Sequence, residues 1–363
     1  MGFTESLLEK IEEGRKHSAA KRLQCAKSIV IWGTGIAAGM VYGRIKDLGM
    51  DIKFFAESNQ SGSEKEFCRK GVRGIGDIAP DDFVVIAANF KYAIHEKLQA
   101  AGINNFAYLD PHLFCNAAAG SFERLVQENS DKIDQVYGML EDHMSQKTFE
   151  NILLHRAVHN IELMEEIYEE PPYFGNDVIE EVSGTFVDCG AFQGDTLQQF
   201  LAQASGSYKY FAIEPEAYNY KKLTEYCEEN KIEHVVCLNL GVWDKKEKLY
   251  FCGEQGADTG KIISGGSEGS TIINADTLDH IVGAEDVSFV KMDIEGAEPN
   301  ALLGGQAVIK ENKPVLAISA YHEPEHLWEI PILIKSFYQG YRICFRHHSW
   351  NVSDTLCYAI ADK

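Results

Sequence analysis

The pattern that most constrains the fold is a β-rich run followed by a glycine-containing turn and a helical segment. Residues 28–59, "SIVIWGTGIAAGMVYGRIKDLGMDIKFFAESN", fit strand, turn, helix and strand in that order. Their apolar residues change from a continuous run to helical spacing and back, and residues 83–110 repeat the unit. Strands that alternate with helices form parallel sheets, because parallel strands need a crossover connection. The pattern therefore predicts an α/β domain.

A longer pattern of the same kind begins at Tyr173. Helical spacing separates most of its β-rich runs, but the last two runs have no helix between them and should pair antiparallel. We therefore predict five parallel strands closed by an antiparallel hairpin, in one seven-stranded sheet. The expected strands are residues 184–190, 208–216, 234–244, 287–296, 315–323, 341–348 and 355–361.

The segment between the two patterns, residues 117–170, contains no convincing strand. It is charged, and its apolar residues recur at intervals of three and four, which predicts helices that end before Pro171. A chain of 363 residues is long enough for two domains of roughly 100–200 residues each. We expect a small α/β domain over residues 1–116, a helical connector over 117–172 and a larger α/β domain over 173–363.

Charge and cysteine content narrow the classes of partner. The chain has 34 Lys and Arg against 55 Asp and Glu, a formal net charge of −21, which repels phosphate polymers. We therefore expect no nucleic-acid partner, and a small neutral, cationic or glycosidic substrate fits better. Nine cysteines without CxxC spacing favour reduced thiols in a cytoplasmic protein over a zinc site or a disulfide framework. No apolar run approaches the roughly 20 residues of a membrane span, so no membrane partner is expected. A homo-oligomer is compatible with the sequence.

The most informative turn lies in residues 186–196, "FVDCGAFQGDT". Ligands of doubly wound sheets bind beyond the carboxyl ends of the strands, where the strand order reverses, so the turn after the first strand is the place to look. Gly190 and Gly194 allow a ligand to approach the main chain closely. Glu214 ends the next strand, 20 residues after Gly194, where a carboxylate accepts hydrogen bonds from ribose hydroxyls. Together they predict a ligand that carries a ribose.

The same turn departs from the fingerprint of nicotinamide dinucleotides. Residues 190–195 read GAFQGD instead of G-x-G-x-x-G, and Asp188 precedes the first glycine. A carboxylate repels a pyrophosphate but suits an ammonium or sulfonium group. The combination favours S-adenosylmethionine, which carries both cations. A tight turn that only begins a helix is the alternative.

Several motifs, in the same order, resemble those of the FkbM family of S-adenosylmethionine-dependent methyltransferases. The resemblance covers about residues 173–361. It implies a class I methyltransferase domain with a Rossmann-like seven-stranded sheet, preceded here by a smaller Rossmann-like domain. It also implies O-methyl transfer to sugars, polysaccharides or polyketides. The motifs are "FVDCGAFQGDT" (186–196), "IEPE" (213–216), "DTLD" (276–279), "VSFVKMDIEGAEPNALLGG" (287–305) and "YHEPEHLWEIPILI" (321–334).

The resemblance assigns roles to individual residues. Glu214 would bind the ribose of the cofactor, and Asp293 would lie beside the cofactor as part of the family's D-x-E-G signature. The residues expected against the adenine are Gly241, Val242 and Asp244, and those expected to hold the methionine end are Asp188, Gly190, Ala191, Gly194 and Thr196.

Methyl transfer from a sulfonium needs alignment and a base that accepts the hydroxyl proton. Our hypothesis makes His322 or Asp293 that base, with Glu295 orienting the acceptor. Alternatively, Asp293 only caps the next helix and His322 only marks a helix entry. These three residues are also hard metal ligands, but nothing in their spacing demands a metal and we expect none.

Two further stretches carry predictions. Residues 252–271 are rich in Gly and Ser and should form a mobile lid or an acceptor-binding loop, or else a solvated insertion. In the first domain, Gly33, Gly35 and Ala38 have G-x-G-x-x-A spacing, and Glu57 follows Gly35 by 22 residues. This turn would suit a dinucleotide or sugar nucleotide. The alternative function is therefore an NAD(P)-dependent oxidoreductase or a sugar-nucleotide-binding protein; the favoured one is O-methylation of a saccharide, nucleotide sugar or related metabolite.

Overall fold

The computed structural model divides into two compact units. The first unit contains Met1–Ser130, Glu150–Glu166 and Trp350–Val352, and the second contains Asp131–Phe149, Ile167–Ser349 and Ser353–Lys363. The helices predicted between the domains do form, but they are divided between the two units. The structure describes residues 2–58, 65–87, 91–110, 113–114, 121–179, 183–204, 206–253, 255–257, 260–263, 265–266 and 269–361.

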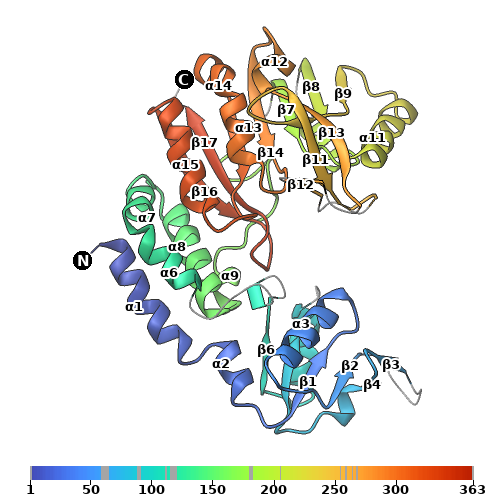
Figure 1. Cartoon of the computed structure of the whole chain (residues 1–363). Coiled ribbons are helices and arrows are strands. Elements are labelled where there is room, and N and C mark those ends of the chain that lie inside the picture. Colours follow the sequence, from blue (N-terminus) through green and yellow to red (C-terminus); the bar gives the residue numbers. More distant parts are fainter. Residues whose placement is uncertain are drawn as a thin grey trace. The chain divides into compact units, whose positions relative to one another are not determined.

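The first unit is an α/β unit (Figure 1). Its strands are β1 (Ile29–Trp32), β2 (Phe54–Ala56), β3 (Glu66–Phe67), β4 (Lys70–Arg73), β5 (Phe83–Ile86) and β6 (Phe106–Tyr108), and its helices include α1 (Phe3–Arg15), α2 (Ala19–Gln24), α3 (Ile36–Asp47), η1 (Ile75–Asp77), α4 (Lys91–Ala100), α6 (Ser121–Glu128) and α9 (Glu162–Glu165). The sheet order is β3-β4-β2-β1-β5-β6. All neighbours pair parallel except β3 and β4, a short antiparallel pair that the sequence did not predict.

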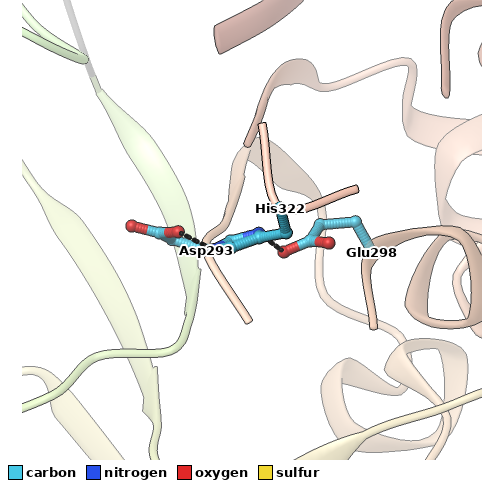
Figure 2. A group of neighbouring side chains, drawn as sticks. All are labelled: Asp293, Glu298 and His322. Atoms are coloured by element: carbon cyan, nitrogen blue, oxygen red, sulfur yellow. Dashed lines mark ion pairs between the residues drawn. The ribbon is translucent and has the colours of Figure 1, made fainter. Parts of the chain in front are cut away.

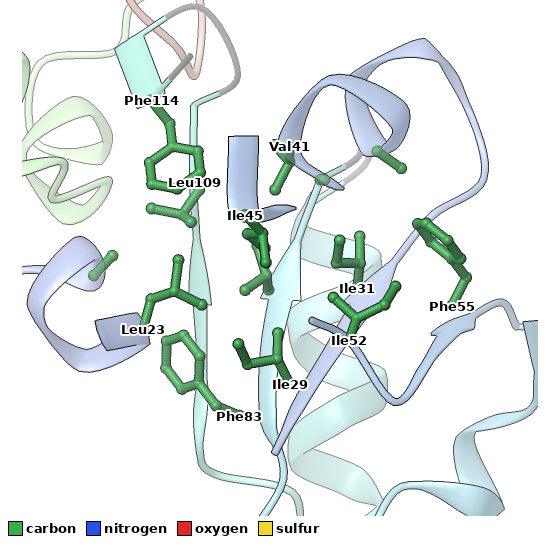
Figure 3. Packing of buried hydrophobic residues seen from close by; sticks show 14 of the residues in the cluster. Leu23, Ile29, Ile31, Val41, Ile45, Ile52, Phe55, Phe83, Leu109 and Phe114 are labelled. Atoms are coloured by element: carbon green, nitrogen blue, oxygen red, sulfur yellow. The ribbon is translucent and has the colours of Figure 1, made fainter. Parts of the chain in front are cut away.

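The strands of the first unit are continuous apolar runs because both faces of its sheet are buried. Every residue of β1 is buried, as expected for a parallel strand covered on both faces. Ile29 and Ile31 of this strand share one cluster with Val41 and Ile45 of α3 and with Leu23 of α2 (Figure 3). The helical spacing in the sequence thus supplies the apolar stripe that covers one face of the sheet.

The second unit is built on the predicted seven-stranded sheet. Its strands are β7 (Gly184–Cys189), β8 (Tyr208–Ile213), β9 (Val235–Leu238), β14 (Val287–Met292), β15 (Val315–Ser319), β16 (Tyr341–His347) and β17 (Thr355–Ala361). The order is β16-β17-β15-β14-β7-β8-β9, and the last two strands in the chain pair antiparallel as predicted. Phe186 of β7 stacks on Tyr210 of β8 and Phe289 of β14, with ring centroids 4.9 and 4.7 Å apart. The predicted class I methyltransferase architecture is confirmed.

The helices of the second unit follow the predicted pattern with one break. They are α7 (Ser130–Tyr137), α10 (Asp195–Gln203), α11 (Ala217–Glu229), α12 (Leu278–Val282), α13 (Glu298–Gly304), α14 (Gln306–Asn312) and α15 (His326–Phe337), while α8 (His143–Val158) is divided between the two units after Phe149. Helical spacing predicts one helix over residues 297–312, between the fourth and fifth strands, but the structure has two helices that meet at Gly305. A Cβ on Gly304 would lie 2.0 Å from the carbonyl oxygen of Trp243, so this backbone packs directly on the segment after the third strand. No helix among the described residues has the length and apolar character needed to cross a membrane.

A second, smaller sheet in this unit was not predicted. It comprises β10 (Gly241–Val242), β11 (Glu247–Cys252), β12 (Lys261–Ile263) and β13 (Thr271–Asp276), in the order β10-β13-β11-β12. The described part of the Gly- and Ser-rich stretch contains β12, and a Cβ on Gly260 would lie 2.2 Å from the ring of Phe251. The stretch therefore packs on an aromatic side chain, and its role as a lid stays a prediction.

Candidate active site

The glycine turn after β7 lies where the strand order reverses. In the seven-stranded sheet β7 has β8 on one side and β14 on the other, the topological position at which doubly wound sheets bind ligands. Gly190 has φ +83° and Gly194, the N-cap of α10, has φ +94°, values that favour glycine. A Cβ on Gly190 would also lie 2.0 Å from the carbonyl oxygen of Asp293. The turn can therefore form only because these positions lack side chains.

Glu214, the predicted ribose ligand, is buried close to the glycine turn. Its side chain follows β8, the residue is 6% exposed, and it accepts backbone hydrogen bonds from Phe192 (2.9 Å) and Glu216 (2.8 Å). Each carboxylate oxygen accepts one of these bonds and keeps a lone pair for another donor. Burial raises the pKa of Glu214 to about 7, although the two backbone bonds oppose the shift. A buried carboxylate short of donors fits the two neighbouring hydroxyls of a ribose.

Asp188 has a different environment from the one predicted. Its side chain is 0% exposed, and its carboxylate is already engaged by Lys291 at 2.9 Å and by the Tyr210 hydroxyl at 2.7 Å. Lys291 therefore balances the charge of Asp188, and the expected contact of Asp188 with the methionine end of the cofactor stays a prediction. The sequence did not predict the roles of Lys291 and Tyr210. A lysine inside the apolar run "VSFVKM" could have indicated a buried charge that needs an acidic partner.

The remaining predicted cofactor residues surround the same end of the sheet. Ala191 and Thr196 are buried at the turn and in the first residues of α10, and Gly241 and Val242 form β10 beside β13. Asp244 lies just after β10 and follows Trp243, against which Gly304 packs. Their contacts with the cofactor stay predictions.

The three predicted catalytic residues come together after β14 and β15, and Figure 2 shows two of them, Asp293 and His322. Nε2 of His322 lies 3.5 Å from Oδ1 of Asp293 and 3.6 Å from Oε1 of Glu295. The other ring nitrogen, Nδ1, lies 2.9 Å from Oε1 of Glu298, whose side chain is completely buried. His326 adds a second imidazole 3.5 Å from the same buried carboxyl group. The imidazole of His322 thus lies between the carboxyl groups of Asp293 and Glu298, and we call these three side chains the acidic row.

Asp293 does not cap the next helix, whereas His322 does lie just before a helix, so its alternative role stays a prediction. Helix α13 begins after Ala297, and no side chain caps it. Asp293 instead accepts a hydrogen bond of 3.0 Å from the Tyr321 hydroxyl. His322 precedes Glu325, the N-cap of α15, by three positions and its side chain is only 8% exposed. Both side chains therefore belong to the acidic row.

The charges around His322 decide its protonation. Burial lowers its pKa, but the nearby carboxylates of Glu298, Glu295 and Asp293 outweigh burial and raise the pKa to about 11. The ring is therefore an imidazolium at neutral pH. Three carboxylates stabilise this charged form, which favours Asp293 over His322 as the base, and the roles of both stay predictions.

The same row has the chemistry of a hard metal site. One ligand atom each from Asp293, Glu298 and His322 lie within 4.8 Å of one another. Figure 2 shows the imidazole ring between the two carboxyl groups, so the ring separates these acids instead of joining them around one open point. The expected absence of a metal stays a prediction.

The glycine turn of the first unit has a simpler environment. Gly33 has φ +122°, and a Cβ there would lie 2.8 Å from the carbonyl oxygen of Ala87, while Gly35 begins α3 without a side-chain cap. Glu57 accepts a hydrogen bond from Thr34 and forms an ion pair of 2.8 Å with Lys65. The acidic residue of this turn is thus held by a lysine at the surface.

The second unit is similar to a known protein family. Residues 188–347 match the methyltransferase FkbM domain. The crystal structure of a methyltransferase FkbM from Methylobacillus flagellatus KT aligns with 98% of this chain and 100% of its own, with a TM-score of 0.76 and 18% identity, so the two share a fold.

An rRNA methylase from Streptococcus thermophilus aligns with 50% of this chain and 89% of its own (TM-score 0.33, 12% identity), too weakly to carry an argument. The same holds for Aeropyrum pernix fibrillarin with bound S-adenosyl-L-methionine, which aligns with 51% of this chain and 70% of its own (TM-score 0.32, 11% identity). No curated protein matches the sequence.

Proposed function

We propose that this chain, which carries a methyltransferase domain of the FkbM family, methylates a hydroxyl oxygen of a saccharide, a nucleotide sugar or a related metabolite. The observation that carries the proposal is the acidic row of Asp293, His322 and Glu298 beside the turn of β7. Such a row can hold a hydroxyl group and accept its proton.

The cofactor that the family implies is S-adenosylmethionine, which supplies a methyl group on a cationic sulfur. Glu214 would hold its ribose, because this buried carboxylate keeps two free lone pairs. The turn from Gly190 to Gly194 would receive the methionine end, and Val242 with its neighbours would lie against the adenine. Within this arrangement the chain itself binds, orients and excludes water.

Oxygen methylation releases one proton, which a residue of the acidic row has to accept. His322 is already protonated at neutral pH, so it orients and balances charge instead of acting as the base. Asp293 is the proton acceptor in our proposal: its side chain is 26% exposed, and Tyr321 holds one of its oxygens. Glu295, 27% exposed, orients the acceptor. Glu298 lies behind the ring and fixes its orientation.

The charge of the site favours one acceptor among the three classes. Asp293 and Glu295 present two partly exposed carboxylates, and the whole chain has a net charge of −21. Carboxylates accept hydrogen bonds from sugar hydroxyls but repel the phosphates of a nucleotide sugar. A neutral saccharide is therefore the first acceptor to test.

The test measures transfer of labelled methyl groups to neutral saccharides and nucleotide sugars, each paired with the deoxy analogue that lacks the methylated hydroxyl. Asp293→Asn should lower kcat by about 10²-fold or more, the range for loss of a general base. The matched control is Glu323→Gln, an exposed acid beside His322 that should keep full activity. Full activity of both Asp293→Asn and His322→Ala, with unchanged affinity for S-adenosylhomocysteine, would overturn the residue roles. A product methylated on nitrogen or carbon would overturn the reaction.

A further inference from the structure

Lys291 lies near the end of β14 and is almost completely buried. Its side chain is 3% exposed, and that of Asp188, its partner across the ladder between β14 and β7, is 0% exposed. Removing an ion from water costs several kcal/mol unless an opposite charge and hydrogen bonds offset the loss. The buried ammonium group of Lys291 therefore needs oxygen atoms held at contact distance, and its charge in turn holds those oxygen atoms in position.

The ammonium group of Lys291 has three neighbours. It lies 2.9 Å from Oδ1 of Asp188, donates a hydrogen bond of 2.7 Å to the carbonyl oxygen of Gly190, and lies 5.7 Å from the ring centre of Tyr173. Burial lowers the pKa of Lys291, but the facing carboxylates, Asp188 first, more than offset this and raise it. The side chain thus stays charged and needs both of its oxygen partners.

One of those partners is the first residue of the cofactor turn. The amide of Gly190 donates to Ile213 of β8 (3.0 Å), while its carbonyl oxygen accepts from Lys291 of β14. The peptide groups around Gly190 are therefore held from both neighbouring strands, in a residue with φ +83°. Without the lysine, Asp188 would be an unpaired buried charge and the carbonyl of Gly190 would lose its donor.

We propose that Lys291 is a positioning residue for the methionine end of the cofactor: it neutralises Asp188 and holds the carbonyl of Gly190 in the binding turn. The inference concerns the cofactor and not the acceptor. Its failure would therefore leave the proposed hydroxyl acceptor standing, and failure of the acceptor test would leave Lys291 unaffected.

The experiment compares two ligands on the full chain by calorimetry. S-adenosylhomocysteine has the amino-acid end, whereas 5′-methylthioadenosine keeps the ribose and adenine but lacks that end. Because Lys291→Met leaves Asp188 unpaired and is at risk of misfolding, the decisive variant is Asp188→Asn combined with Lys291→Met, which removes both charges. We expect this variant to bind S-adenosylhomocysteine about tenfold or more weakly, and 5′-methylthioadenosine within about twofold of wild type.

The control and the contrary outcomes are equally specific. Lys209 of β8 also pairs with an acid, Glu285 at 2.6 Å, but its side chain is 40% exposed, so Lys209→Met should change neither affinity. Wild-type affinity of the double variant for S-adenosylhomocysteine would show that Lys291 only balances charge. An equal loss for both ligands would show a general disturbance of the fold. Either result overturns the inference.

Discussion

The turn after β1 in the first unit and the turn after β7 in the second can be compared residue by residue. Both join a buried parallel strand to a helix, and both have an acidic residue at the end of the next strand. Glu57 is 26% exposed on its side chain and paired with Lys65, whereas Glu214 is 6% exposed and, among the described residues, accepts hydrogen bonds from two backbone amides. A carboxylate already neutralised by a lysine has less to gain from ribose hydroxyls than one that lacks a cation. The comparison favours the second turn as the cofactor site.

The largest effect should come from closing the space that the second turn needs. In Gly190→Ala the new methyl group would meet the carbonyl oxygen of Asp293 at 2.0 Å, in a residue with φ +83°. We expect a loss of about 3 kcal/mol in stability, seen as a lower unfolding midpoint of the cofactor-free chain.

Gly35→Ala provides the matched substitution in the first turn. Gly35 has φ −89°, and a Cβ there would meet no atom within 4 Å, so the cost should stay below about 1 kcal/mol. Equal shifts of the two midpoints would contradict the steric comparison.

A second effect should separate the acidic residues of the two turns. Glu214→Gln removes the charge that is expected to hold the ribose, and we expect binding of both S-adenosylhomocysteine and 5′-methylthioadenosine to weaken about tenfold or more. Glu57→Gln should leave both affinities unchanged, because Glu57 belongs to the other turn. Calorimetry measures all four values. If Glu57→Gln weakened binding and Glu214→Gln did not, the assignment of the cofactor to the second turn would be wrong.

The sequence was sufficient for the parts of this site that depend on strand ends. Parallel strands bring their carboxyl ends to one edge of the sheet, so the spacing of "FVDCG", "IEPE" and "KMDIEG" already placed Asp293 and Glu214 near one turn. His322 followed from the same reasoning, because it lies just after β15.

The parts that were missed depend on contacts between strands far apart in the chain. Lys291 faces Asp188 only because β14 pairs with β7 in that register, and no local spacing records this pairing. The small sheet was not predicted for a related reason: β10 pairs with β13 across 28 intervening residues, and the glycines in that segment resembled an unpacked loop. The protonated state of His322 needed the buried Glu298, whose position behind the ring only the structure provides.

The smallest effect is a proton exchange that should occur in the second turn alone. The pKa of Glu214 is raised to about 7, mainly by burial, so the free protein carries a proton there at mildly acidic pH. This raised pKa contributes stability that is complete below the ordinary glutamate pKa near 4.3 and is lost as the pH rises through about 7. Ribose hydroxyls that donate to the carboxylate stabilise its charged form. Binding of S-adenosylhomocysteine at pH 6 should therefore release up to one proton, and affinity should rise between about pH 5 and 7 and then level off.

Calorimetry at pH 6 in buffers with different ionisation enthalpies measures this proton release directly. Glu214→Gln should abolish it, while Glu57→Gln should keep it, since the carboxylate paired with Lys65 lies in the first turn. Proton release that persists in Glu214→Gln would assign the titration to another group. Glu214, held by backbone amides, would then not differ in proton exchange from Glu57, held by a lysine, and the comparison of the two turns depends on that difference.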